Sequence, residues 1–124
     1  MKQALATAQA PAAIGPYSQG IAAGQTVYVS GQLPIDPATA AIPEGIAAQT
    51  AQSLKNIQAI LAEQGMTLAD VVKTTVFLAD MNDFAEMNKV YGEYFAQPFP
   101  ARSAVQVAKL PKGAPLEIEC IAVK

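Results

Sequence analysis

The segment that decides the fold is Leu116-Glu117-Ile118-Glu119-Cys120-Ile121-Ala122-Val123. Side chains alternate between the two faces of a β-strand, so residues two apart share a face. The even-numbered positions of this segment are all apolar or small. The odd-numbered positions begin with Glu117 and Glu119 and end with Ile121 and Val123. A sheet that contains this strand therefore has one apolar face and a second face that is half acidic and half apolar.

The rest of the chain divides into short elements separated by proline and glycine. Residues 9–20 hold two prolines and two glycines and predict a structured loop. Alternation of apolar and polar side chains and runs of β-branched residues predict strands, whereas apolar residues spaced three and four apart predict helices. Gly31 is expected to end the first strand. Residues 71–78 carry apolar side chains on both faces, which favours a central strand covered on both sides. The expected strands cover residues 26–30, 71–78, 103–107 and 116–123. The first expected helix covers residues 46–61, and the second begins at a capping-box pattern over residues 83–86 and ends at residue 95.

This arrangement predicts an α+β fold in one domain over residues 1–124. The expected order is strand, strand, helix, strand, helix, strand, strand, in which one of the two strands before the first helix has no assigned range, and both helices pack on one face of a mixed sheet. Ile121, Val123 and Phe77 then lie on the other face, and no segment of the chain remains to cover them. Only 15% of the residues are charged, against roughly a quarter in an ordinary soluble domain. We therefore expect a second subunit to cover this face.

Composition excludes several classes of function. The net charge is −2 and the seven lysines are scattered, so the sequence predicts no nucleic-acid partner. Histidine is absent and Cys120 is the only cysteine, which argues against a metal site, a disulfide and histidine-dependent nucleophiles. No glycine-rich phosphate loop supports a nucleotide cofactor. Neither a signal peptide nor an apolar stretch of about 18 residues is found, so we expect a cytoplasmic protein without a membrane partner.

Arg102 is the only arginine, and it directly precedes the predicted buried run 104–107. A guanidinium held near a core binds a carboxylate or a phosphate, because it cannot lose its charge. Two alternatives follow. Glu117 or Glu119 neutralises it as a structural ion pair, or a small anionic ligand does. Desolvation would raise the pKa of a carboxylate on this face toward the range useful for proton transfer, whereas a nearby Arg102 would lower it.

Other candidate residues have weaker signals, each with a simple structural alternative. Ser30 and Gly31 lie at the end of a predicted strand. Either the hydroxyl and the glycine let a ligand approach the backbone closely, or the two residues form an ordinary turn. Tyr17 follows Gly15-Pro16 and covers a pocket, or merely fixes a loop. Asn88 reaches inward from the second helix, or lies on its surface. Cys120 is predicted to be a packed core thiol.

Taken in order, these motifs closely resemble the YjgF/RidA family of reactive-intermediate deaminases over nearly the whole chain. The residues that carry the resemblance are 10–19, Ser30-Gly31-Gln32, Gln52-Ser53-Leu54 with Asn56-Ile57, 71–78, Asn82-Asp83-Phe84, Met87-Asn88, Tyr91, Pro100-Ala101-Arg102, Leu110-Pro111-Lys112 and Glu117-Ile118-Glu119.

The resemblance implies a chorismate-mutase-like fold that forms a homotrimer with a ligand pocket at each subunit boundary. It implies hydrolysis of enamines and imines such as 2-aminoacrylate and 2-aminocrotonate to 2-keto acids and ammonia, without a cofactor. By the same resemblance, Arg102 would hold the substrate carboxylate and Glu117 would activate water. The other residues implied to line or support the pocket are Tyr17, Ser30, Gly31, Asn88 and, through its backbone, Ala104.

Two points qualify the resemblance. Many relatives carry a cysteine two residues after the arginine, where this chain has Ala104, so thiol chemistry at that position is excluded. The alternatives are a regulatory protein that binds 2-keto acids without turnover, a ribonuclease or translation inhibitor, and a chaperone-like holdase. Retention of Glu117 beside Arg102 favours the enzyme, since binding alone needs only the arginine. The acidic composition and missing histidines disfavour the ribonuclease.

Overall fold

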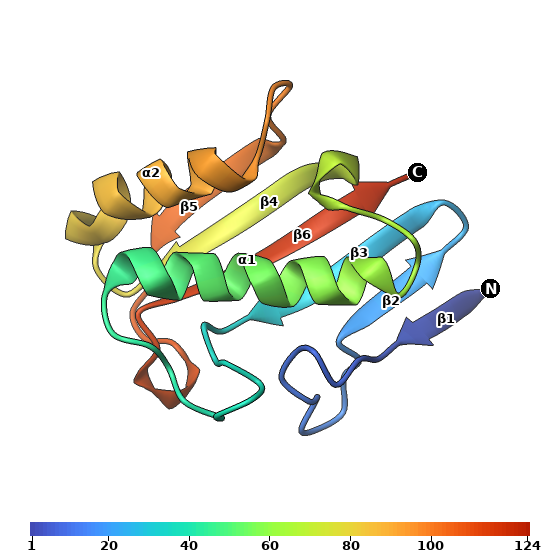
Figure 1. Ribbon diagram of the computed structural model, residues 1–124, viewed down its shortest axis with the longest axis horizontal. Helices are drawn as coiled ribbons and strands as arrows, with labels where there is room; N and C mark the ends of the chain where they lie inside the picture. Colours follow the sequence, from blue (N-terminus) through green and yellow to red (C-terminus); the bar gives the residue numbers. More distant parts are fainter.

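The computed structural model describes residues 1–124, in which one six-stranded sheet runs through the molecule beside two long helices (Figure 1). The strand order is β1-β2-β3-β6-β4-β5. The strands are β1 Lys2–Leu5, β2 Gly20–Ala23, β3 Thr26–Gln32, β4 Val71–Leu78, β5 Ala101–Gln106 and β6 Leu116–Val123; the helices are α1 Ile46–Ala62 and α2 Phe84–Tyr94, with 3₁₀ turns η1 Leu68–Asp70, η2 Met81–Asp83 and η3 Pro111–Gly113.

The sheet is mixed, as predicted. Neighbouring strands are antiparallel except β4 and β5, which are parallel. Parallel neighbours need a crossover connection, and α2 provides it. The expected α+β architecture is therefore confirmed, with β6 between β3 and β4 at the middle of the sheet.

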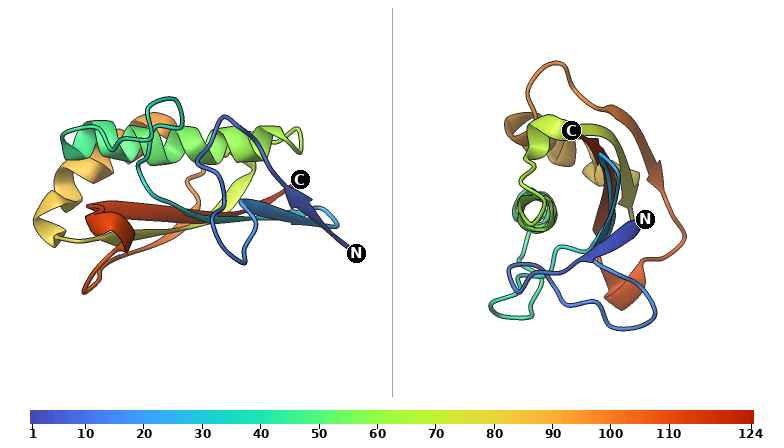
Figure 2. Two further views of the ribbon diagram at one scale, coloured as in Figure 1. Left: turned by 90° about the horizontal axis from the view of Figure 1, so that it is seen from below. Right: turned by 90° about the vertical axis from the view of Figure 1, so that its right-hand side faces the viewer.

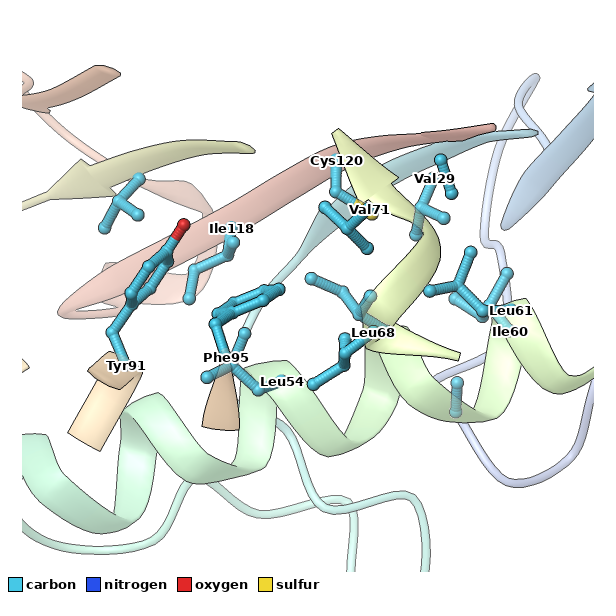
Figure 3. Close-up of a cluster of buried hydrophobic side chains, with 14 of the residues drawn as sticks. Val29, Leu54, Ile60, Leu61, Leu68, Val71, Tyr91, Phe95, Ile118 and Cys120 are labelled. Carbon is cyan, nitrogen blue, oxygen red and sulfur yellow. The ribbon is translucent and has the colours of Figure 1, made fainter. Parts of the chain in front are cut away.

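Both helices pack on the same face of the sheet (Figure 2). On α1, the side chains of Leu54, Ile57, Ile60 and Leu61 are completely buried. Figure 3 shows part of this core, in which Leu54 and Ile118 lie between α1 and the sheet. Full burial of each such aliphatic side chain stabilises the fold by about 1.5–3 kcal/mol, so this layer fixes the face of the sheet that α1 covers.

Neither α1 nor α2 lies on the opposite face of the sheet (Figure 2). Tyr28 pairs with Ile121, and Phe77 pairs with Glu117 and Val105, so these side chains share that face. Tyr28 is 51% exposed and Val105 is 44% exposed. The prediction that an apolar second face lacks a cover within the chain is confirmed.

Several boundaries differ from the predictions. The strand expected over 26–30 continues through Gly31 to Gln32, because a register irregularity after Val29 lets it go on pairing with β6. The segment expected as a buried strand over 103–107 begins at Ala101 and forms the sheet edge, largely exposed. The helix from Phe84 has no capping-box bond. Asp80 instead caps the preceding turn, accepting a 2.8 Å bond from the Asn82 N–H.

No helix of this chain has both the length and the apolar character required to cross a membrane.

Candidate active site

A cavity of about 560 Å³ lies where the loop before β2, the end of β3 and the start of β6 meet. It brings together four predicted site residues, Tyr17, Ser30, Gly31 and Glu117. The remaining lining residues are Pro11, Ala12, Ile14, Gln19, Gln32, Leu33, Ile35, Pro111, Lys112 and Glu119. The cavity is thus apolar on the loop side and polar along the two strands.

Glu117 lies directly against the backbone of Gly31. A Cβ atom added at Gly31 would come within 2.7 Å of the Glu117 carboxyl carbon and 2.9 Å of its Oε2. Sequence reasoning assigned Gly31 to close approach of a ligand. The structure shows that the space left by its missing side chain is occupied by the Glu117 carboxylate.

Burial raises the pKa of the Glu117 carboxyl, and the nearby negative charge of Glu119 raises it further. Desolvation and a like charge both disfavour the ionised form. The sequence left open whether Arg102 would lower this pKa instead. Within one chain it does not, because Glu117 and Arg102 lie on different faces of the sheet, as described below.

The contact between Gly31 and Glu117 gives a first prediction. In Gly31→Ala the new Cβ displaces the far end of a flexible side chain, so the fold is kept while the carboxylate moves. We expect the imine hydrolysis implied by the resemblance to fall by about 10²-fold, the usual cost of displacing a reacting group by about 1 Å. Gly92→Ala is the matched control, because an added Cβ there meets nothing within 4 Å. Equal rates for both variants would show that the position of Glu117 is unimportant.

Hydrogen bonds hold the loop that carries Tyr17 in place. The Ser30 hydroxyl donates to the Ser18 carbonyl at 2.6 Å. The buried Gln19 side chain donates to the carbonyls of Thr7, Ala10 and Pro11 and accepts from the Thr7 N–H at 2.7 Å. Ser30 therefore anchors the cavity wall as well as lining it, and Tyr17, 52% exposed, stands at the rim.

A second group of predicted residues lies on the helix side of β5. The Arg102 NH1 donates to Oδ1 of Asn88 on α2 at 2.7 Å. The guanidinium carbon lies 4.7 Å from the ring centroid of Tyr91 and 5.5 Å from that of Phe84. Neither Glu117 nor Glu119 is among these partners, so the structural ion pair considered from sequence is absent.

The strand register explains why the two groups stay apart. Arg102 on β5 pairs with Thr74 on β4, whereas Glu117 on β6 pairs with Phe77. Thr74 and Phe77 are three residues apart on one strand, so their side chains, and those of their partners, point to opposite faces. Within one chain the structure therefore does not bring Arg102 and Glu117 together.

Ala104 and Cys120 complete the set of residues considered from the sequence. Ala104 is half-buried and packs against the hydrophobic core. Cys120 is buried, and burial raises its pKa to about 12, as expected of a core thiol. No group of three or more histidine, cysteine or acidic side chains is arranged to hold a metal ion.

Sequence reasoning did not identify Tyr91 or Gln19 as site residues. Phe84, Asn88 and Tyr91 are spaced four and three residues apart on one helix, so they share one helix face. This spacing was the available signal for Tyr91, because Arg102 contacts that face. No comparable pattern marks Gln19, whose bonding partners lie in an irregular loop.

Known proteins resemble this chain along nearly its whole length. A Salmonella typhimurium protein named 2-iminobutanoate/2-iminopropanoate deaminase is 51% identical over 100% of this chain and 99% of its own. The YjgF gene product of E. coli is 50% identical, with a TM-score of 0.93 and 98% of both chains covered. E. coli TdcF with bound serine is 47% identical, also with a TM-score of 0.93 and 98% of both chains covered. Residues 7–124 match the family described as endoribonuclease L-PSP. The chain therefore belongs to this family, the YjgF/RidA family.

Proposed function

We propose that this protein hydrolyses 2-imino acids, and the enamines that tautomerise to them, to 2-keto acids and ammonia. The observation that carries the proposal is the arrangement of Glu117, a carboxylate with a raised pKa held against Gly31 in a cavity. The full-length similarity to proteins named 2-iminobutanoate/2-iminopropanoate deaminase supports the choice of substrate. The substrate class is therefore small imines that carry a carboxylate, such as those derived from 2-aminoacrylate and 2-aminocrotonate.

The reaction requires little from the protein. A protonated imine carbon is electrophilic, so water adds to it once water and substrate are positioned together. Glu117 accepts the proton of the attacking water, forming a tetrahedral amino alcohol. It then returns that proton to the nitrogen, and the C–N bond breaks as ammonia departs. The hydroxyl group of the amino alcohol gives its own proton back to Glu117 and becomes the carbonyl, and Glu117 passes this proton to the released ammonia or to water. Arg102 would hold the substrate carboxylate through the donors not used by Asn88.

These two residues act on one substrate only if two chains combine. The uncovered sheet face carries Tyr28, Val105 and Val123, all at least 40% exposed, which favours burial against another copy. We therefore place the site at the boundary between subunits of a homotrimer, with the Glu117 cavity from one chain and the Arg102 group from its neighbour. Tyr17 and Ser30 would line this site, and Asn88 would support Arg102. The cytoplasmic location expected from the sequence stays a prediction.

The direct test is turnover. A dehydratase acting on serine generates 2-aminoacrylate in solution, and release of pyruvate is followed with and without this protein. We expect the protein to accelerate pyruvate release above the spontaneous rate, and analytical ultracentrifugation to show a trimer. A spontaneous rate unchanged by the protein, together with tight binding of 2-oxobutanoate, would instead indicate a regulatory protein that binds 2-keto acids.

The ribonuclease alternative is tested in the same preparation, since the family description names an endoribonuclease. The net charge of −2 and the absence of histidine disfavour it. Cleavage of a labelled RNA that disappears in Glu117→Gln would assign nuclease chemistry to this site and overturn the proposal.

The pKa of Glu117 gives a second prediction. As a base Glu117 works ionised, so activity falls as the pH drops through its pKa. The Glu119 charge raises that pKa, and removing the charge in Glu119→Gln lowers it. We therefore expect the acid limb of the kcat profile to move to lower pH. Glu63→Gln, which removes an exposed charge at the end of α1, is the control and leaves the profile in place. An unshifted limb in Glu119→Gln would mean that another group controls it.

A further inference from the structure

The Arg102 guanidinium rests on an aromatic surface formed by α2. Its central carbon is 4.7 Å from the Tyr91 ring centroid and 5.5 Å from the Phe84 centroid, distances at which a cation is attracted to a ring face. The Asn88 amide oxygen accepts one of its N–H groups. Three residues at one face of α2 therefore fix the plane and the direction of the guanidinium.

Contacts with β4 and with Phe95 hold the Tyr91 ring in place. It is only 4% exposed, and its hydroxyl lies 2.7 Å from the Thr74 hydroxyl on β4, the strand residue paired with Arg102. Its ring centroid is 4.6 Å from that of Phe95. Figure 3 shows the Tyr91 hydroxyl pointing toward the sheet and Phe95 beside the ring. Burial raises the pKa of Tyr91, so the phenol stays neutral and keeps its hydrogen-bonding proton.

We propose that Tyr91, anchored by Thr74, is a positioning residue that holds the Arg102 guanidinium in the orientation in which its free edge meets the substrate carboxylate. The inference rests on the proposed function and deepens it. Without this support, the arginine side chain would have to be ordered when substrate binds, which weakens binding. Tyr91 touches the arginine and acts through it.

The sequence offers an unusually direct measurement. Arg102 is the only arginine, so the side-chain Nε–Hε group gives a single cross-peak in a ¹H–¹⁵N spectrum. A guanidinium stacked on a ring has its protons displaced upfield by the ring current. We expect this displacement in the native protein, its retention in Tyr91→Phe and its loss in Tyr91→Leu. Tyr94→Leu, which removes a neighbouring aromatic ring from the same helix, is the matched control and keeps the signal in place.

Binding shows whether that orientation serves the ligand. The probes are 2-oxobutanoate and its neutral amide, which has the same shape without the charge. We expect Tyr91→Leu to weaken binding of the acid by roughly tenfold and to leave binding of the amide nearly unchanged. A variant that merely loosens the fold would weaken both. Tyr94→Leu is expected to keep the native ratio of the two affinities, and an equal ratio in Tyr91→Leu and Tyr94→Leu would overturn the inference.

Thr74 supplies a second variant that keeps both the ring and the shape of the core. Thr74→Val and Tyr91→Phe remove opposite ends of one hydrogen bond, so each is expected to weaken acid binding about threefold, and the double variant no further. Additive losses would show that the bond does not act as a unit and would contradict the anchoring role. Arg102→Ala separates the two proposals. If Arg102→Ala binds the acid with native affinity, the proposed function fails. If Arg102→Ala abolishes binding of the acid but the Tyr91 and Thr74 variants bind it with native affinity, only this inference fails.

Discussion

Arg102→Ala is expected to reduce binding of 2-oxobutanoate and hydrolysis of the imine by about 10²–10³-fold, because truncating one partner of a hydrogen-bonded charge pair costs roughly 2–5 kcal/mol. Removing the guanidinium leaves the substrate carboxylate without its planar fork of donors. Thermal stability should change little, since Arg102 is only half-buried and its hydrogen-bond partner is the neutral, exposed Asn88.

Two further variants sharpen that result. Arg102→Lys keeps the charge but loses the bidentate geometry and the stacking on Tyr91, so we expect an intermediate loss of about tenfold. Lys89→Ala removes an equally positive but exposed charge from α2 and should retain full activity, which excludes a general effect of net charge. Binding of 2-oxobutanoate at full affinity by Arg102→Ala would rule out the anion-holding role.

Glu117→Gln should separate catalysis from binding. The amide fills the same space beside Gly31 but cannot accept a proton, so we expect kcat to fall by about 10²–10⁴-fold while affinity for 2-oxobutanoate is nearly kept. Glu119→Gln, two residues along the same face, should retain activity at neutral pH. Hydrolysis at the native rate by Glu117→Gln would show that water is activated elsewhere.

The same substitution should also stabilise the protein slightly. The folded-state pKa of Glu117 is raised, so ionisation of its carboxyl opposes folding at pH values above that pKa. Glu117→Gln removes this cost. We therefore expect a higher Tm than native at neutral pH and a difference that vanishes at acid pH, where native Glu117 is protonated. A gain in stability at the loss of activity is expected where a reactive group is held in a desolvated place.

The strands with strong side-chain patterns were predictable from the sequence. The bounds of β4 and β6 and the start of α1 agree with the predictions, because β-branched runs and helical spacing are local signals. β1 and the Gly20–Ala23 strand were not assigned, since alanine and glycine have little preference for strands and a four-residue segment shows too few alternations.

The candidate residues were predictable from the sequence, but their arrangement was not. Alternation within a strand shows that Glu117 and Glu119 share a face, but it does not give the register between β4, β5 and β6. A register slip of one residue would move the side chain of Arg102 to the other face of the sheet. The structure fixes this register through the pairs Thr74 with Arg102 and Phe77 with Glu117.

The placement of Arg102 and Glu117 on opposite faces means that two inactive proteins should complement each other. In a mixed trimer with the proposed sites between subunits, an Arg102→Ala chain would still supply an intact Glu117 cavity, and a Glu117→Gln chain would still supply an intact Arg102. Random assembly of equal amounts pairs the two intact halves at about a quarter of the subunit boundaries, so about that share of native activity should return after the chains are unfolded and refolded together. If both residues of one chain served the same substrate, mixing would restore nothing.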